Sequence, residues 1–257
     1  MKKEWWKTLF DDKYTQTYVD TSSEKRTATE VDFLLKNLSI KKGTNILDLA
    51  CGYGRHAIKL SQAKFKVTGL DYSKHLINLA KATAKEKGLS IDFLRGDIRN
   101  FSFSKKFDAV ICMFTSFGYF TREEDHEKVI KQVSKALKRN GVFFLDVKNP
   151  IATTIDFEKN ISAGNKELRK TETLSNGINL STSQVFDIHK MRWKINRTWK
   201  INGKVKKYYA DIRLFTLPEL SNLLGHHNLR IEKVWGNFNG SPLSYNSPRI
   251  IVLARKK

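Results

Sequence analysis

The chain has 257 residues, enough for one full hydrophobic core, and its 40% hydrophobic content indicates a globular protein and excludes a disordered one. No apolar run approaches the length of a membrane span, and the run after the basic start is too short for a signal peptide, so we expect a cytoplasmic protein. Lys and Arg (47) outnumber Asp and Glu (26), which gives a formal net charge of +21; because the lysines are scattered through every segment, we interpret most of this charge as a solvated surface.

The N-terminal part combines an aromatic leader with an amphipathic helix. Apolar residues recur at helical spacing between residues 23 and 38, so we expect a helix there, capped by one of the two serines at its start. Residues 5–20 are aromatic and polar without a clean period, and we expect them to cover one end of a sheet as a lid. Tyr14 and Tyr18 are four residues apart and so share one face, which makes them the leader's candidates for ligand contacts.

A strand, a tight glycine turn and a helix are predicted by the stretch NILDLACGYGRHAIKL. Gly52 and Gly54 let the backbone approach a ligand, and the helix start offers unpaired N–H groups, so we expect a bound cofactor. Gly52, Gly54 and Ala57 fit a loose G-x-G-x-x-A dinucleotide fingerprint, with Asp71 at the distance of a ribose-binding acid. Asp48 would repel a pyrophosphate but attract the ammonium of a methionyl group, which favours S-adenosyl-L-methionine (SAM) over a nicotinamide cofactor.

Alternating strands and helices follow. We expect strands at 66–70, 91–94, 107–113 and 142–147, and helices at 55–62, 74–87 and 123–137. The second strand ends in Asp71, which is followed by Tyr72. A carboxylate at this point can accept both ribose hydroxyls, and we interpret Asp71 in this way rather than as a cap of the next helix.

Five motifs occur in order, ILDLACGYG, VTGLDYS, LRGDI, FDAVICMF and GVFFLDV. In order and spacing they resemble the class I SAM-dependent methyltransferases, in particular the small-molecule and sugar N-methyltransferases. The resemblance implies that Asp97 accepts from the adenine amino group and that the Ile98 N–H donates to the ring. The sequence departs from the family at Ala50, which replaces the first glycine of E/D-x-G-x-G-x-G and is small enough to keep the turn. The cofactor-binding residues expected are Tyr18, Asp48, Ala50, Gly52, Gly54, Asp71, Tyr72, Asp97, Ile98 and Met113.

The pattern changes after the fifth strand. Four alternating apolar runs lie between about residues 166 and 214, and the turn signals between them predict antiparallel hairpins. Thr216 and Glu219 then form a capping box that starts a helix, and two strands at 230–236 and 249–255 end the chain as an antiparallel pair. The fold class expected is α/β, a Rossmann-like seven-stranded doubly wound sheet with its last strand antiparallel and an inserted antiparallel β subdomain. The expected divisions are a lid segment and helix at 1–40, the SAM-binding core at 41–150, the inserted subdomain at 151–214 and the completing helix and strand pair at 215–257.

The acceptor is inferred mainly from absences. The loop at 114–120 lacks the Asn/Asp-Pro-Pro-aromatic motif of nucleobase amine methyltransferases, and Cys112 lacks the Pro-Cys or Thr-Cys context of cytosine-5 enzymes. No metal-ligand spacing and no His–Asp pairing stand out, so we expect no metal and single out no catalytic residue. A neutral amine needs little more than loss of a proton, which favours an N-methyltransferase. The substrate-binding candidates are Tyr14, Phe117, Tyr119, Tyr245 and Arg249.

The favoured function is in-line transfer of a methyl group from SAM to a small-molecule acceptor, which leaves S-adenosyl-L-homocysteine as product. An RNA or nucleoprotein methyltransferase is the alternative, and it predicts Lys and Arg clustered around the pocket mouth and salt-dependent binding. A non-enzymatic SAM-binding protein and a nicotinamide-dinucleotide-binding protein are further alternatives. The inserted β subdomain is a candidate homodimer surface, and no membrane partner is expected.

Overall fold

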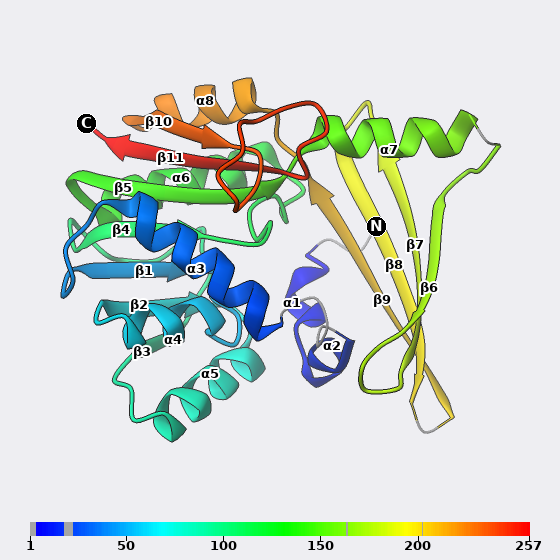
Figure 1. Cartoon of the computed structure of the whole chain (residues 1–257), viewed down its shortest axis with the longest axis horizontal. Helices are drawn as coiled ribbons and strands as arrows, with labels where there is room; N and C mark the ends of the chain where they lie inside the picture. Colours follow the sequence, from blue (N-terminus) through cyan, green and yellow to red (C-terminus); the bar gives the residue numbers. More distant parts are fainter. Residues whose placement is uncertain (1–3, 18–22, 163, 202) are drawn as a thin grey trace.

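Two separate β-sheets form the frame of the molecule (Figure 1). The computed structural model describes residues 4–17, 23–162, 164–201 and 203–257. The larger sheet has seven strands in the order β10-β11-β5-β4-β1-β2-β3. Its strands are β1 (Asn45–Leu49), β2 (Lys66–Asp71), β3 (Asp92–Arg95), β4 (Phe107–Cys112), β5 (Leu137–Lys148), β10 (Leu229–Trp235) and β11 (Arg249–Lys256). The predicted fold class is confirmed, because β1 to β5 pair in parallel and β11 is antiparallel to both of its neighbours.

Helices cover both faces of this sheet. Successive residues of a strand point to opposite faces of the sheet, and here both faces carry apolar side chains, as a sheet covered on both sides requires. Val110 and Ile111 of β4, for example, belong to different core clusters and are both fully buried. One face packs against α3 (Glu24–Leu38), α4 (Arg55–Gln62) and α5 (Lys74–Glu86), the other against α6 (Glu123–Ala136) and α8 (Leu217–Gly225). Ser23 caps α3, and α8 begins with the predicted capping box between Thr216 and Glu219.

The strand order places a switch point between β1 and β4. From β1 the chain moves to β2 and β3 on one side, whereas β4 and β5 lie on the other side. In open parallel sheets of this kind, ligands bind beyond the carboxyl ends of the strands at the switch point. The ends of β1, β2 and β4 therefore define where a site is expected.

The smaller sheet is the predicted insertion. It contains β6 (Leu168–Thr173), β7 (Asn179–Asp187), β8 (Arg192–Ile201) and β9 (Lys204–Arg213), paired antiparallel in this order. Helix α7 (Pro150–Ser162) precedes it and was not predicted. Its β-branched Ile151, Thr153 and Thr154 have low helix propensity, and Ile151 and Ile161 are exposed, so the apolar residues do not follow one helical face.

The leader forms two short helices, α1 (Trp6–Leu9) and α2 (Asp12–Thr17), which lie between the two sheets (Figure 1). Trp5 donates from Nε1 to the carbonyl oxygen of Asp211 on β9 at 3.1 Å, and the Ser73 hydroxyl donates to the carbonyl oxygen of Phe10 at 2.5 Å. The leader is thereby hydrogen-bonded to the small sheet at one point and to the large sheet's end at another. Among the described residues, no helix is long and apolar enough to span a membrane.

Candidate active site

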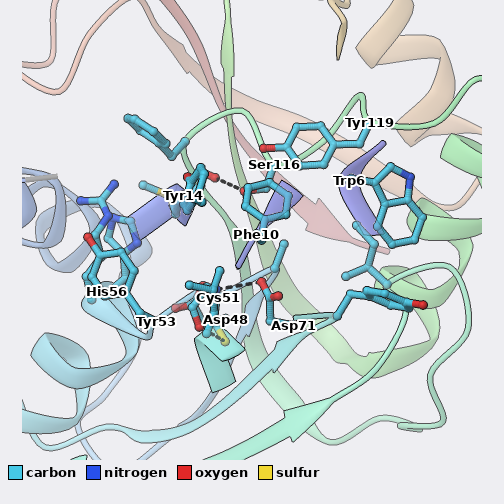
Figure 2. A pocket seen from close by; sticks show the side chains of 18 of the residues that line it. Trp6, Phe10, Tyr14, Asp48, Cys51, Tyr53, His56, Asp71, Ser116 and Tyr119 are labelled. Carbon is cyan, nitrogen blue, oxygen red and sulfur yellow. Dashed lines mark hydrogen bonds between the residues drawn. The ribbon is translucent and has the colours of Figure 1, made fainter. Parts of the chain in front are cut away.

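A cavity lies at the carboxyl ends of β1, β2 and β4, beneath the leader. Acidic side chains and the glycine turn form one side of it, and aromatic rings of the leader and of the loop after β4 form the other (Figure 2). Its wall comprises Trp6, Phe10, Tyr14, Asp48, Ala50, Cys51, Gly52, Tyr53, Arg55, His56, Asp71, Tyr72, Leu76, Asp97, Ile98, Met113, Phe114, Ser116, Tyr119 and Phe120. Most of the predicted cofactor residues thus come together in one place, while Tyr18 lies outside the described residues.

Asp48 is the most unusual group in the cavity wall. It is the next-to-last residue of β1, and only 1% of its surface is exposed. Among the described residues its Oδ2 atom has no hydrogen-bond partner. Burial raises the pKa of this carboxyl to about 7. A buried carboxylate oxygen without a hydrogen-bond partner is costly, so a cationic group bound beside it would stabilise the ionised form.

The turn after β1 adopts left-handed backbone conformations at Ala50 (φ 57°), Gly52 (58°) and Gly54 (78°). Two features exclude a side chain at Gly54. Its left-handed backbone disfavours any residue but glycine, and a Cβ atom there would lie 2.7 Å from Cζ of Phe93. Ala50 adopts a conformation that alanine rarely takes, and such strain is typical of functional turns. The turn keeps its shape without the first glycine, at the expense of this local strain.

Asp71 is held in place by backbone N–H groups. Gly52 donates to its Oδ2 atom at 2.9 Å and Ser73 to its Oδ1 atom at 2.8 Å. The cap of α5 is Ser73, whose hydroxyl accepts from the N–H of Leu76, so Asp71 is not needed for that purpose. Burial raises the pKa of Asp71, although the two N–H donors oppose this. The carboxylate is therefore fixed at the cavity with lone pairs left for further donors.

Asp97 and Ile98 follow β3 on the same rim. Arg99 donates from Nη2 to Oδ2 of Asp97 at 2.6 Å and from Nε to Oδ1 at 3.1 Å, which fixes the carboxylate. Arg99 also lies over the rings of Trp6 and Phe120, at 5.2 and 4.7 Å from their centroids. Sequence reasoning did not identify Arg99, because its contacts to the leader span many residues.

An aromatic wall faces the acidic side chains. The ring of Phe10 is 4.8 Å from Tyr14 in an edge-to-face contact and 5.9 Å from Tyr119 in a stacked one. Two other substrate candidates lie outside this cavity. Phe117 is fully buried against Phe215 in the core, and Tyr245 is 73% exposed. Phe117 belongs to the apolar core cluster, where its ring also contacts His126 of α6, and the chain turns directly after it at Gly118 (φ 115°).

The loop after β4 is strained and anchored by one buried acid. Phe114 and Thr115 both have positive φ, 59° and 58°. Asp146 of β5 is fully buried; its Oδ2 accepts from the N–H of Phe114 at 2.8 Å, and its Oδ1 accepts from Nε of Arg249 at 2.6 Å. The predicted substrate residue Arg249 therefore also helps to hold this loop.

A buried charge cluster supports the helix α4. Glu30 of α3 accepts from Arg26, from Arg55 and, at 2.8 Å, is bonded to Nε2 of His56. Burial acts to raise the pKa of Glu30, but the hydrogen bond with His56 and the charge of Arg55 outweigh it and hold the pKa well below its usual range. Among the described residues, the Nη2 atom of Arg55 has no partner, and Arg55 lines the cavity.

Within the described ranges, no group of three or more His, Cys, Asp and Glu side chains is placed to hold a metal ion. Cys51 and Cys112 are buried and unbridged, as expected for small core side chains.

Comparison with known proteins gives concordant results. Residues 46–141 match the family described as methyltransferase domain. A glycine/sarcosine N-methyltransferase of Halorhodospira halochloris is 32% identical over 149 residues, which cover 54% of this chain and 56% of that protein. The chain thus spans about half the length of this relative. A dTDP-3-amino-3,4,6-trideoxy-alpha-D-glucopyranose N,N-dimethyltransferase of Streptomyces venezuelae is 23% identical over 80% of this chain and 84% of its own.

Solved structures share the whole fold. The CcbJ methyltransferase of Streptomyces caelestis superimposes with a TM-score of 0.78 at 14% identity, over 93% of this chain and 98% of its own. A SAM-dependent methyltransferase of Clostridium acetobutylicum gives a TM-score of 0.76 at 20% identity, over 95% and 98%. The comparisons thus identify a methyltransferase domain at residues 46–141 and show that the chain has the fold of SAM-dependent methyltransferases.

Proposed function

We propose that the protein transfers a methyl group from SAM to an amine nitrogen of a small molecule. The observation that carries this proposal is the buried Asp48 carboxylate, whose Oδ2 atom lacks a hydrogen-bond partner among the described residues, at a cavity with two further carboxylates. The relatives named as N-methyltransferases support the choice of nitrogen. The cavity fits SAM because the cofactor offers a cation, two hydroxyls and an adenine edge.

Each side chain has a proposed role in holding the cofactor. Asp48 pairs with the methionyl ammonium, Asp71 accepts from the ribose hydroxyls, and Asp97 with the Ile98 N–H reads the adenine edge. The left-handed turn at Ala50, Gly52 and Gly54 allows close approach of the backbone, and Tyr72 and Met113 pack on either side. We assign the cofactor's own carboxylate to the Nη2 atom of Arg55.

When bound, SAM supplies an electrophilic methyl group. The chain's part in the reaction is to align the acceptor nitrogen with that group and to exclude water. Phe10, Tyr14 and Tyr119 form the wall through which the acceptor would approach, and their ring faces stabilise positive charge. An amine that binds uncharged needs no strong base among these residues.

Isothermal titration with SAM, with NADH as comparator, tests the cofactor assignment. We expect SAM binding by the wild type, strong loss in Asp48→Asn and in Asp71→Ala, and full retention in Asp92→Asn, a matched control at an exposed aspartate of β3. Binding of NADH in preference to SAM, or unchanged SAM affinity in both cavity variants, would contradict the proposal. Radiolabelled methyl transfer to a panel of small amines and to RNA then separates the amine proposal from the nucleic-acid alternative.

We further propose a cytoplasmic location and a homodimer formed through the outer face of the small sheet. Val185 and Val205, which are 37% and 50% exposed, lie on that face and support the dimer. Sedimentation velocity measures the assembly state. A monomer at all concentrations would contradict the dimer.

A further inference from the structure

A second cavity adjoins the first, between the end of the large sheet and the inner face of the small one. The two cavities share Phe10, Tyr14, Phe114 and Tyr119 in their walls. Strand β8 contributes Trp193, Ile195 and Arg197 to the second cavity, and strand β9 contributes Tyr208, Ala210 and Ile212. An acceptor placed in this cavity would reach the cofactor cavity past the shared aromatic rings.

The two cavities differ in charge. Three aspartates line the first cavity. The wall of the second contains four cationic residues, Arg26, Lys148, Arg197 and Arg249, and within the described part of the chain it contains no Asp or Glu. The chain thus presents a basic chamber next to an acidic one.

Lys148 and Arg249 are the central pair of this basic chamber. They face each other directly in the antiparallel ladder of β5 and β11, so two like charges lie side by side. Like charges in this position destabilise a sheet. Asp146 accepts from Nε of Arg249, but the Nη2 atom of Arg249 is buried and, among the described residues, has no hydrogen-bond partner.

Lys148 has surroundings that suit an anionic partner. Its Nζ atom lies 4.8 Å from the ring centroid of Trp193 on β8. Burial and the charge of Arg249 lower the pKa of Lys148, and an anion placed between the two cations would offset both effects. Arg197 lies on the opposite wall, 5.4 Å from the ring of Tyr208, and adds positive charge from the inserted sheet.

We propose that the methyl acceptor is a small amine that also carries an anionic group, a carboxylate or a phosphate, and that Lys148 and Arg249 bind this group. The inference rests on the proposed methyl transfer and names its substrate class. With the anion held at the pair, the amine end of the same molecule points past Tyr14 and Tyr119 toward the cofactor cavity. The inserted sheet then serves to select the acceptor by its charge.

Two matched pairs of probes test this by titration calorimetry on protein saturated with S-adenosyl-L-homocysteine. Glycine against glycinamide tests a carboxylate, and O-phosphoethanolamine against ethanolamine tests a phosphate. In at least one pair we expect the anionic member to bind about 10- to 100-fold more tightly, as for hydrogen bonds to charged groups. Whichever pair shows the preference identifies the anion.

Three variants locate the preference. Lys148→Met should reduce anion binding to the level of the neutral probe, and Arg249→Lys should weaken it while keeping a charge beside Asp146. Lys200→Met removes one lysine from the opposite face of β8, where Lys200 is exposed, and should bind as the wild type does. Affinity for S-adenosyl-L-homocysteine should be equal in all four proteins.

Distinct outcomes overturn distinct statements. Equal binding of charged and neutral members in both pairs, or equal loss in Lys200→Met, overturns the anionic acceptor. A parallel loss of affinity for S-adenosyl-L-homocysteine in Lys148→Met would show that Lys148 and Arg249 bind the cofactor's carboxylate. This result would also overturn the anionic acceptor. If the wild type binds neither SAM nor S-adenosyl-L-homocysteine, the proposed function itself fails.

Discussion

Replacing Asp48 by asparagine should stabilise the ligand-free protein, and more so at high pH than at low pH. Asp48 is buried, and burial raises its pKa from 3.8 to about 7. Because the folded-state pKa lies above the unfolded one, the favourable protonated form is fully present below pH 3.8, and its contribution is lost as the pH rises through about 7. An amide in the same place does not ionise and so escapes this loss.

The size of the effect follows from the pKa difference. One pKa unit corresponds to about 1.4 kcal/mol, so a difference of roughly three units makes ionised Asp48 unfavourable by up to about 4 kcal/mol. Between about pH 5 and about pH 8 this penalty grows by roughly 2–3 kcal/mol. Other titrating groups, such as Glu30 and His56, are the same in both proteins and cancel in the difference. Any hydrogen bond that the amide lacks adds an offset that does not vary with pH.

Urea denaturation of the wild type and of Asp48→Asn at several pH values, followed by circular dichroism, measures this difference. Asp92→Asn serves as the control at an exposed aspartate and should show a small difference without this trend. Saturating SAM should raise the stability of the wild type and of the control but not of Asp48→Asn. A stability difference between wild type and Asp48→Asn that stays constant from pH 5 to about pH 8 would refute the reasoning.

Three further changes have expected outcomes. Gly54→Ala should lower the free energy of unfolding by about 2–4 kcal/mol in urea denaturation, because alanine would have to adopt a left-handed backbone conformation and its Cβ would clash with Phe93. An unchanged urea midpoint would contradict this. Asp146→Ala leaves Arg249, whose side chain is 14% exposed, without its carboxylate partner and should lower the free energy of unfolding by about 3–5 kcal/mol, measured in the same way, whereas a loss below 1 kcal/mol would argue against the anchoring role. Glu30→Gln should destabilise the protein at neutral pH, and because the pKa of Glu30 is lowered, the wild type's advantage should shrink as the pH falls below about 4.5; a gap that persists in acid would exclude the ion pairs as its source.

The elements of the large sheet were predictable because their signals are local. The strand of β4 is a short apolar run, and α4 begins and ends where the pattern after the glycine turn predicted, at Arg55 and Gln62. The capping box of α8 lies within four consecutive residues and was read directly. Signals of this kind depend only on residues that are neighbours in the sequence, so one sequence is enough to recognise them.

The parts that were missed depend on partners distant in the chain. Glu30 joins Arg55 and His56 across 25 and 26 positions, and Asp146 joins Arg249 across 103 positions. No local pattern marks such pairs. Phe117, predicted as a substrate contact, is fully buried against Phe215, a partner distant in the chain that only the fold reveals.

The leader's two attachments have a kinetic consequence. It is bonded to β9 through Trp5 and to the start of α5 through Phe10, and Phe10 and Tyr14 line both cavities. Displacing this one short segment would therefore uncover both cavities together. With the proposed cofactor in one cavity and the proposed acceptor in the other, a change that loosens the leader should speed the exchange of both ligands to the same degree.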